Sequence, residues 1–153
     1  MTEKSQRQQN AELFLSSIRH CDVLGIGFAA ASEDSLTLML PYGKKIVGNP
    51  FNGVIHSGSI TTLMDTAMGL CVPLSLENFE LCPTLDLRID YMGAAIPNET
   101  VFGQAIVFRV TEHVVFVRGM AFHEGAAERP IARCVASFMR LGKRLKEAEK
   151  NKS

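Results

Sequence analysis

The chain has 153 residues, 46% of them apolar and 21% charged, so it is long enough to bury the core of one ordinary domain. Its sixteen acidic residues balance its sixteen basic ones, and this neutrality argues against nucleic acid as a partner. No stretch approaches the roughly 20 apolar residues of a membrane-spanning helix. Residues 1–10 are polar and lack the apolar run of a signal peptide or anchor. We therefore expect a cytoplasmic protein without a membrane partner.

The cysteines show neither a C-x-x-C spacing nor nearby histidine pairs; they are Cys21, Cys71, Cys82 and Cys134. We predict no metal site from this pattern. Reduced thiols that pack as small apolar groups are the expected state.

In chain order, the first third of the sequence predicts one short helix and two strands. A tail over residues 1–10 precedes an amphipathic helix from Ala11 to Arg19. A strand is predicted from Cys21 to Ala31, and a second over residues 35–40, where leucine occupies every other position. Residues 42–54 contain three glycines, a proline and two asparagines, which is typical of a loop.

The period then changes to that of a helix. Six apolar residues fall at i, i+3, i+4, i+7, i+8 and i+11, and they are Ile60, Leu63, Met64, Ala67, Met68 and Cys71. We expect Ser57 or Ser59 to cap this central helix. Pro73 limits how far it continues undisturbed.

Asp65 lies about 140° around this helix from Ile60, outside the apolar stripe. The helix is otherwise almost free of charge from residue 57 to residue 76. An isolated carboxylate in such surroundings is costly unless it is paired or functional. A surface aspartate bonded to a neighbouring threonine is the alternative, and we favour function.

The remaining sequence predicts four strands, over residues 84–91, 101–111, 114–123 and 131–141, before a charged tail over 143–153. Consecutive strands joined by short turns are mainly antiparallel. One long apolar helix against such a sheet makes a two-layer α+β fold. We predict a single domain over residues 11–142.

The start of the central helix is predicted to bind an oxyanion. Free N–H groups and the positive end of the helix dipole suit a carbonyl oxygen that gains charge. The backbone N–H groups of Ser57 and Gly58 are the expected donors, and His56 is given a positioning role. The other histidines are dispersed and expected at the surface or in turns; they are His20, His113 and His123.

Asn49 and Asn52 lie in the loop just upstream of His56. Asparagine in such loops commonly bonds its own backbone. A side-chain amide near the helix start is equally able to orient a carbonyl or an attacking water, so both interpretations stay open. Thr84 offers a hydroxyl group at the start of a strand, where threonine is usually structural.

The run from Asn49 to Gly58, with Asp65 nine residues after His56, resembles the N…G-x-x-H-G-G motif of hotdog-fold acyl-CoA thioesterases of the phenylacetate-pathway (PaaI) type. Residues 83–92 also resemble that family's strand after the helix. The resemblance implies a six-stranded antiparallel sheet wrapped around one long central helix. It also implies homodimers joined edge to edge, often paired into homotetramers, with active sites between subunits.

The resemblance assigns roles by position. Asp65 corresponds to the nucleophile or general base, the N–H of Ser57 to the oxyanion donor, and Thr84 to a hydroxyl that helps to place the water. His56 is the motif histidine, and we slightly favour Asn49 over Asn52 as the motif asparagine. Ser57 departs from the family pattern, because it replaces the first motif glycine.

The function expected from this reading is hydrolysis of an acyl-CoA or related thioester, with no metal or redox cofactor. Four apolar residues are candidates to shape the acyl pocket: Met64, Met68, Phe51 and Phe79. The candidates to hold the CoA phosphates are Arg88, Arg109, Arg118, Arg133, Lys143 and Arg144. Two alternatives are a hotdog-type enoyl-CoA hydratase or dehydratase, and a non-catalytic module that binds acyl thioesters.

Overall fold

The computed structural model describes residues 6–142, and the predicted tail over 143–153 lies outside this range. The elements in chain order are α1 (Gln6–Ser16), α2 (Arg19–Leu24), β1 (Gly27–Ala31), β2 (Ser35–Leu40), the 3-10 helix η1 (Lys44–Ile46), α3 (Ser57–Ser75), β3 (Thr84–Tyr91), β4 (Val101–Val110), β5 (Val114–Phe122) and β6 (Ala132–Met139).

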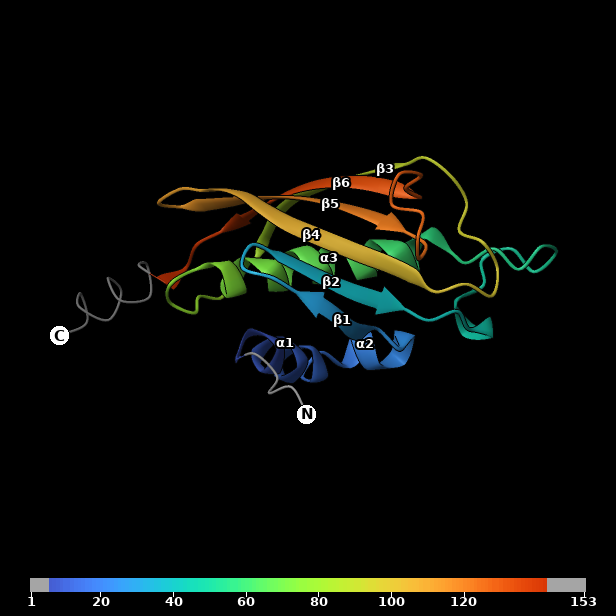
Figure 1. The fold of residues 1–153 in the computed structure, drawn as a ribbon, viewed down its shortest axis with the longest axis horizontal. Helices are drawn as coiled ribbons and strands as arrows, with labels where there is room; N and C mark the ends of the chain where they lie inside the picture. Colours follow the sequence, from blue (N-terminus) through green and yellow to red (C-terminus); the bar gives the residue numbers. More distant parts are fainter. Residues whose placement is uncertain (1–5, 143–153) are drawn as a thin grey trace.

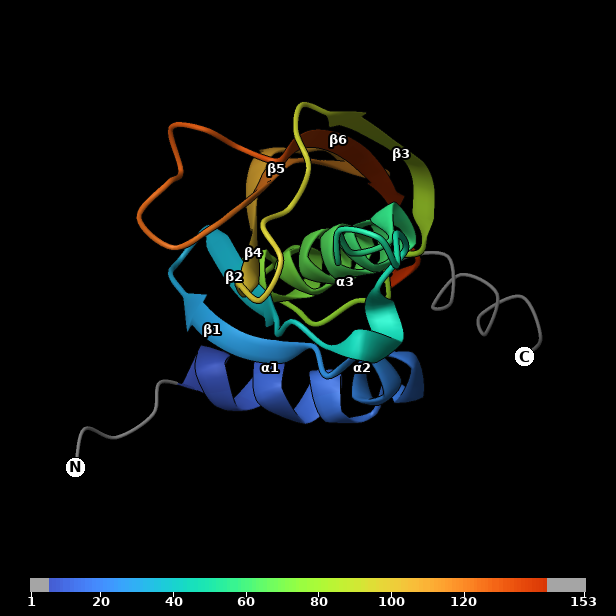
Figure 2. The same ribbon diagram turned by 90° about the vertical axis from the view of Figure 1, so that its right-hand side faces the viewer.

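The strands form one six-stranded sheet in the order β1-β2-β4-β5-β6-β3, and every neighbouring pair is antiparallel. The sheet curves around α3, which runs along its concave side (Figure 2). The predicted hotdog arrangement, an antiparallel sheet around one long central helix, is confirmed. Figure 1 shows α1 and α2 beside β1 at one edge of the sheet, while β3 forms the other edge.

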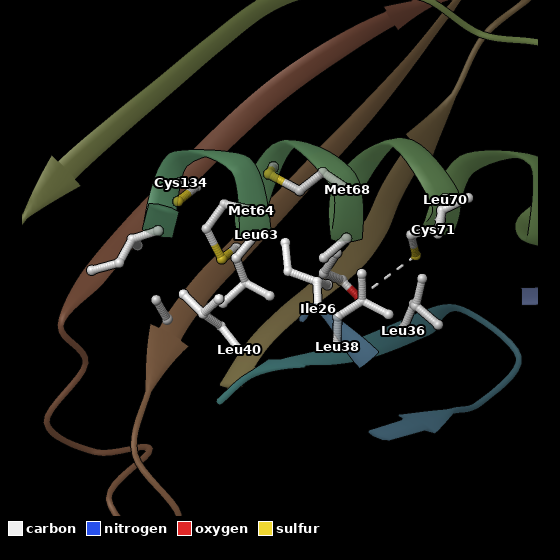
Figure 3. Packing of buried hydrophobic residues seen from close by; sticks show 14 of the residues in the cluster. Ile26, Leu36, Leu38, Leu40, Leu63, Met64, Met68, Leu70, Cys71 and Cys134 are labelled. Atoms are coloured by element: carbon white, nitrogen blue, oxygen red, sulfur yellow. Dashed lines mark hydrogen bonds between the residues drawn. The ribbon is translucent and has the colours of Figure 1, made fainter. Parts of the chain in front are cut away.

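The core lies between the sheet and α3. Strand β2 alternates buried and half-buried residues, as its sequence predicted, and Leu36, Leu38 and Leu40 are almost completely buried. Figure 3 shows these leucines below α3, with Leu40 under Leu63 and Met64 and with Leu36 under Cys71. Each such side chain contributes about 1.5–3 kcal/mol when it is fully buried, so this contact fixes the helix against the sheet.

The first predicted strand is partly wrong. Residues 21–24 belong to α2, and β1 begins only at Gly27. Gly25 adopts a left-handed conformation (φ 75°) and ends α2, which is a common helix stop. The helix places the Cys21 thiol in the core, 3.6 Å from the Thr66 hydroxyl. A short apolar run does not distinguish a buried helix turn from a strand.

Two further predictions are corrected. Helix α1 begins at Gln6 rather than Ala11, so part of the predicted tail is helical. His123 is buried, so the predicted surface position is wrong, whereas the predicted turn is present because the His123 carbonyl oxygen accepts a hydrogen bond from the N–H of Ala126. Its Nδ1 lies 2.9 Å from the carbonyl oxygen of Thr100, and its Nε2 accepts a hydrogen bond from the N–H of Ile96. The side chain therefore anchors the connection between β3 and β4.

Candidate active site

Helix α3 begins directly after His56, whose Nδ1 accepts a hydrogen bond from the N–H of Gly58 at 2.9 Å. His56 is thus the N-cap, and the prediction that Ser57 or Ser59 caps the helix is wrong. The Ser59 hydroxyl instead donates to the carbonyl oxygen of His56. An acceptor Nδ1 places the proton of the neutral imidazole on Nε2.

This cap distinguishes the two predicted oxyanion donors. The N–H of Gly58 is already bonded to His56. Within residues 6–142, the N–H of Ser57 has no hydrogen-bond partner. Since it also lies at the positive end of the helix dipole, it is the donor left for a ligand.

The loop before α3 supports His56 from behind. The N–H of His56 donates to the carbonyl oxygen of Ile46 at 2.7 Å, and Val47 pairs with Ile55 as an isolated antiparallel bridge. Gly48 packs directly on His56, because a Cβ at residue 48 would lie 2.8 Å from the His56 Cα. Only glycine allows this approach without moving the loop.

Tyr91, at the end of β3, also holds the helix start. Its hydroxyl donates to the carbonyl oxygen of Ser57 at 3.0 Å and lies 2.8 Å from the Thr61 hydroxyl. The sequence indicated Tyr91 only as one residue of an alternating strand. Residues 57 and 91 are distant in the chain, so no local pattern pointed to this contact.

Asp65 lies two turns further along α3 and is half-buried. The Thr84 hydroxyl donates to Asp65 Oδ1 at 3.1 Å, so two of the predicted residues come together across α3 and β3. Ser57 and Asp65 are eight residues apart on one helix, which separates them by about 12 Å along its axis. One chain therefore does not bring its own free N–H group to its own carboxylate.

A cavity of about 410 Å³ lies beside Asp65. Its wall is mainly apolar and comes from α1, α3, the segment before β3 and the end of β6. The apolar lining residues include Phe14, Ile18, Leu70, Pro73, Leu81 and Phe138. The sequence did not predict that α1 lines this space, because a contact between distant elements leaves no local signal.

An ion pair closes part of this wall. Glu80 lines the cavity, and its carboxylate accepts hydrogen bonds from Arg140, one of them from Nε at 3.2 Å. The side chains of Glu80 and Arg140 are only 10% and 21% exposed. The hydrogen bond to Glu80 raises the pKa of Arg140 above its usual value, so Arg140 stays charged. Arg140 also donates to the carbonyl oxygen of Thr111.

Cys82 lies on the same wall as a free, half-buried thiol. Burial raises its pKa to about 11, and the negative charge of Glu80 adds to the shift. All four cysteines are free, and the other three are buried. Within the described part of the chain, no group of His, Cys, Asp and Glu side chains is arranged to hold a metal ion.

The two asparagines both form turns in the exposed loop. Asn49 Oδ1 accepts from the N–H of Phe51, and Asn52 Oδ1 accepts from the N–H of Val54. These bonds are the self-capping arrangement expected of loop asparagines. They engage the side-chain oxygens, and both residues are exposed.

The pocket candidates are spread over the molecule. Met64 and Met68 are completely buried in the core, while Phe51 is 97% exposed. Phe79 is also exposed, and its ring centroid lies 5.7 Å from that of Phe14 at the cavity wall. None of these four is among the described residues that line the cavity.

The candidate phosphate ligands are dispersed too. Arg88 pairs with Asp90 at 3.0 Å, and Arg118 and Arg133 line a separate hollow over the outer face of β5 and β6. Arg109 lies near the end of β4; Lys143 and Arg144 are outside the described residues. Two exposed lysines that the sequence did not single out, Lys44 and Lys45, begin the segment that pairs with the helix start.

The comparisons with known proteins agree with this geometry. Residues 52–130 match the family model of the thioesterase superfamily. A crystal structure of a Pseudomonas aeruginosa protein is 51% identical in sequence, with a TM-score of 0.80, over 88% of this chain and 98% of that one. The Escherichia coli PaaI protein of the phenylacetic acid degradation operon superimposes with a TM-score of 0.76 over 89% of this chain and 94% of that one. At 16% identity, the latter likeness concerns the fold alone.

A Halobacterium salinarum protein named as a candidate esterase is 35% identical over 75 residues, which are 47% of this chain. The match spans half the length of that relative.

A curved six-stranded antiparallel sheet around one long central helix is the arrangement of a hotdog protein. The chain belongs to the thioesterase superfamily. No described helix is long and apolar enough to cross a membrane.

Proposed function

We propose that the protein hydrolyses acyl-CoA thioesters to free acid and CoA, at sites formed between two copies of the chain. The observation that carries the proposal is the pairing of Asp65 with Thr84 beside a largely apolar cavity. Family membership favours a thioester as the bond cleaved.

In the proposed mechanism, the N–H of Ser57 polarises the thioester carbonyl, and Asp65 acts as general base on a water that Thr84 helps to orient. The water oxygen bonds to the carbonyl carbon as Asp65 takes its proton. The resulting oxyanion is stabilised at the helix start. The C–S bond then breaks, and the departing thiolate takes the proton from Asp65. Asn49, with its free amide, is the proposed contact for the carbonyl or the water, and His56 keeps the first turn in place.

Two features support a site shared between subunits. The first is the separation of about 12 Å between Ser57 and Asp65 within one helix, which a neighbouring copy in antiparallel orientation would close. The second is β3, an edge strand with exposed side chains such as Leu85 and Tyr91. Its free N–H and C=O groups are a template for pairing with another chain. Asp65 would then face the partner subunit's Ser57, in a homodimer or a homotetramer of two such pairs. A cytoplasmic location, consistent with four free thiols, belongs to the same proposal.

The test is turnover of an acyl-CoA panel by the wild type, by Asp65→Asn and by Asp22→Asn. The control removes the same charge from an exposed residue of α2 that lies neither on β3 nor among the described residues lining the cavity. We expect Asp65→Asn to lower kcat by about 10²–10⁴-fold, the usual contribution of a general base, and Asp22→Asn to stay near the wild type. Equal rates for the wild type and Asp65→Asn would contradict the proposal. Hydration of enoyl-CoA without hydrolysis would indicate the hydratase, and tight binding without turnover would indicate the binding module.

A further inference from the structure

We infer that the cavity beside Asp65 binds the acyl group of the substrate, that this group is uncharged and of intermediate length, and that Gly69 and Phe14 set the length. The inference rests on the proposed thioesterase function and deepens it by naming the class of acyl group. It concerns two parts of the cavity wall, one on α3 and one on α1.

Gly69 lies on the α3 part of the cavity wall, near the proposed chemistry. It follows Asp65 by four residues, so it lies on the same face of α3, one turn further on, and it lines the cavity. Glycine inside a helix is destabilising relative to alanine. Packing among the described residues does not explain why residue 69 is glycine, because a Cβ there would meet only the Phe138 ring, at an ordinary 3.6 Å. The missing side chain keeps the space between Asp65 and the apolar interior open.

Phe14 lines the cavity from another element. It lies on α1, and its ring centroid is 5.7 Å from that of Phe79. An acyl chain that enters beside Asp65 therefore shares the cavity with an aromatic side chain of α1. The volume of about 410 Å³ is at the small end of the range for pockets that hold small molecules, which favours an acyl group of intermediate length.

The charges on the wall exclude an acidic acyl group. The two acidic side chains that line the cavity are Asp65 and Glu80, and none of its described lining residues is basic. Arg140 is bonded to Glu80 and to the carbonyl oxygen of Thr111. A second carboxylate at the end of the acyl chain would therefore meet negative charge and no cationic partner among the described lining residues.

The experiment compares acetyl-, butyryl-, octanoyl-, palmitoyl- and succinyl-CoA as substrates of five proteins. These are the wild type, Gly69→Ala, Gly69→Leu, Phe14→Ala and the control Leu13→Ala, whose side chain is 73% exposed on the same helix as Phe14. We expect the wild type to prefer octanoyl-CoA and to cleave succinyl-CoA poorly.

Gly69→Leu should lower the ratio of kcat/KM for octanoyl-CoA over butyryl-CoA by about tenfold, and Gly69→Ala should lower it less. Phe14→Ala should raise the ratio of palmitoyl-CoA over octanoyl-CoA by about tenfold. Leu13→Ala should leave both ratios within about twofold of the wild type. The ratios report acyl length, whereas a general loss of folding or catalysis lowers all substrates together.

Three outcomes would overturn the inference: a wild type that prefers succinyl-CoA, ratios unchanged in Gly69→Ala and Phe14→Ala, or a uniform loss in the Gly69 variants together with a changed oligomeric state by light scattering. The last result would indicate that Gly69 contacts the backbone of a second copy of the chain.

If the wild type cleaves no thioester, the proposed function fails. Calorimetry with octanoyl- and butyryl-CoA then tests the inference about the cavity. Gly69→Leu should then weaken octanoyl-CoA binding about tenfold more than butyryl-CoA binding, and equal weakening would overturn it.

Discussion

The first turn of α3 and the middle of the same helix, the two parts of the proposed site, are built in opposite ways. At the first turn, polar contacts hold the backbone from several sides, through His56, Tyr91 and the carbonyl oxygen of Ile46. Around Asp65 and Gly69, an apolar cavity lies against the helix and few polar contacts cross it. A backbone N–H group must keep one position to stabilise an oxyanion, whereas an acyl group needs room. Fixed geometry and open space are thus separated along one helix.

The largest effect on catalysis is expected from Ser57→Pro, at the first turn of α3. This substitution removes the backbone N–H group and changes little else. Ser57 is the first residue of α3, where proline is well tolerated. His56 before it has φ −67° and ψ 132°, which is the conformation that a residue before proline prefers. We expect kcat to fall by about 10²–10³-fold, as for the loss of one oxyanion donor, with the melting temperature nearly unchanged. Ser57→Ala keeps the N–H group and should lose less than about threefold. Similar losses in both variants would assign the effect to the side chain.

Mixing two inactive variants tests whether the first turn of α3 in one subunit acts together with Asp65 of the other subunit. In a dimer of one Ser57→Pro chain and one Asp65→Asn chain, one of the two sites keeps both groups. Random exchange of subunits should therefore restore about a quarter of the wild-type activity. If the mixture stays as inactive as its components, both groups belong to one chain and the shared site is wrong.

At the cavity wall, Arg140→Met should give the largest loss of stability. It leaves the Glu80 carboxylate largely buried without its main partner. Breaking such a pair costs about 3 kcal/mol, which corresponds to a fall of roughly 6–12 °C in melting temperature for a domain of this size. Arg129→Met is the matched control, because Arg129 also pairs with a glutamate but is 84% exposed. It should change stability by less than about 0.5 kcal/mol. Equal melting temperatures for the two variants would show that the buried pair does not hold the wall.

Tyr91→Phe tests the first turn of α3 with a smaller expected effect. It removes the hydroxyl that bonds to the Ser57 carbonyl oxygen and lies beside the Thr61 hydroxyl. The net loss of about 1 kcal/mol for one hydrogen bond predicts a fall of about fivefold in kcat, because the first turn holds the oxyanion less well. KM should change less than kcat, as for an interaction that matters mainly in the transition state. A change in stability without any change in kcat would restrict Tyr91 to a structural role.

The sequence predicted the elements that have a long and clear pattern. Helix α3 lies where the helical period indicated, and strands β4 and β5 lie where the β-rich runs indicated, within a residue or two at their ends. The motif also pointed to Asp65 and Thr84, which do come into contact. The six residues of α2 were missed, because so short an apolar segment fits a strand equally well.

The rest depends on contacts between distant elements. The cap by His56, the bond from Tyr91 to Ser57 and the wall that α1 contributes to the cavity have no local signature. The burial of His123 likewise depends on two backbone partners in the connection between β3 and β4. Sequence patterns predict which face of an element is apolar, but tertiary packing decides which polar groups meet.

The smallest effect at neutral pH is expected for chemical modification of Cys82, which lines the cavity. Burial raises the pKa of its thiol to about 11, and only the thiolate reacts readily. Modification by N-ethylmaleimide should therefore be slow at pH 7 and accelerate about tenfold per pH unit up to pH 10. The three other cysteines are buried, so Cys82 should react first, and its adduct should fill the cavity and stop turnover of octanoyl-CoA. Cys82→Ser should keep its activity under the same treatment, followed by mass spectrometry. Complete labelling of Cys82 in a fully active enzyme would show that the acyl group does not enter this cavity.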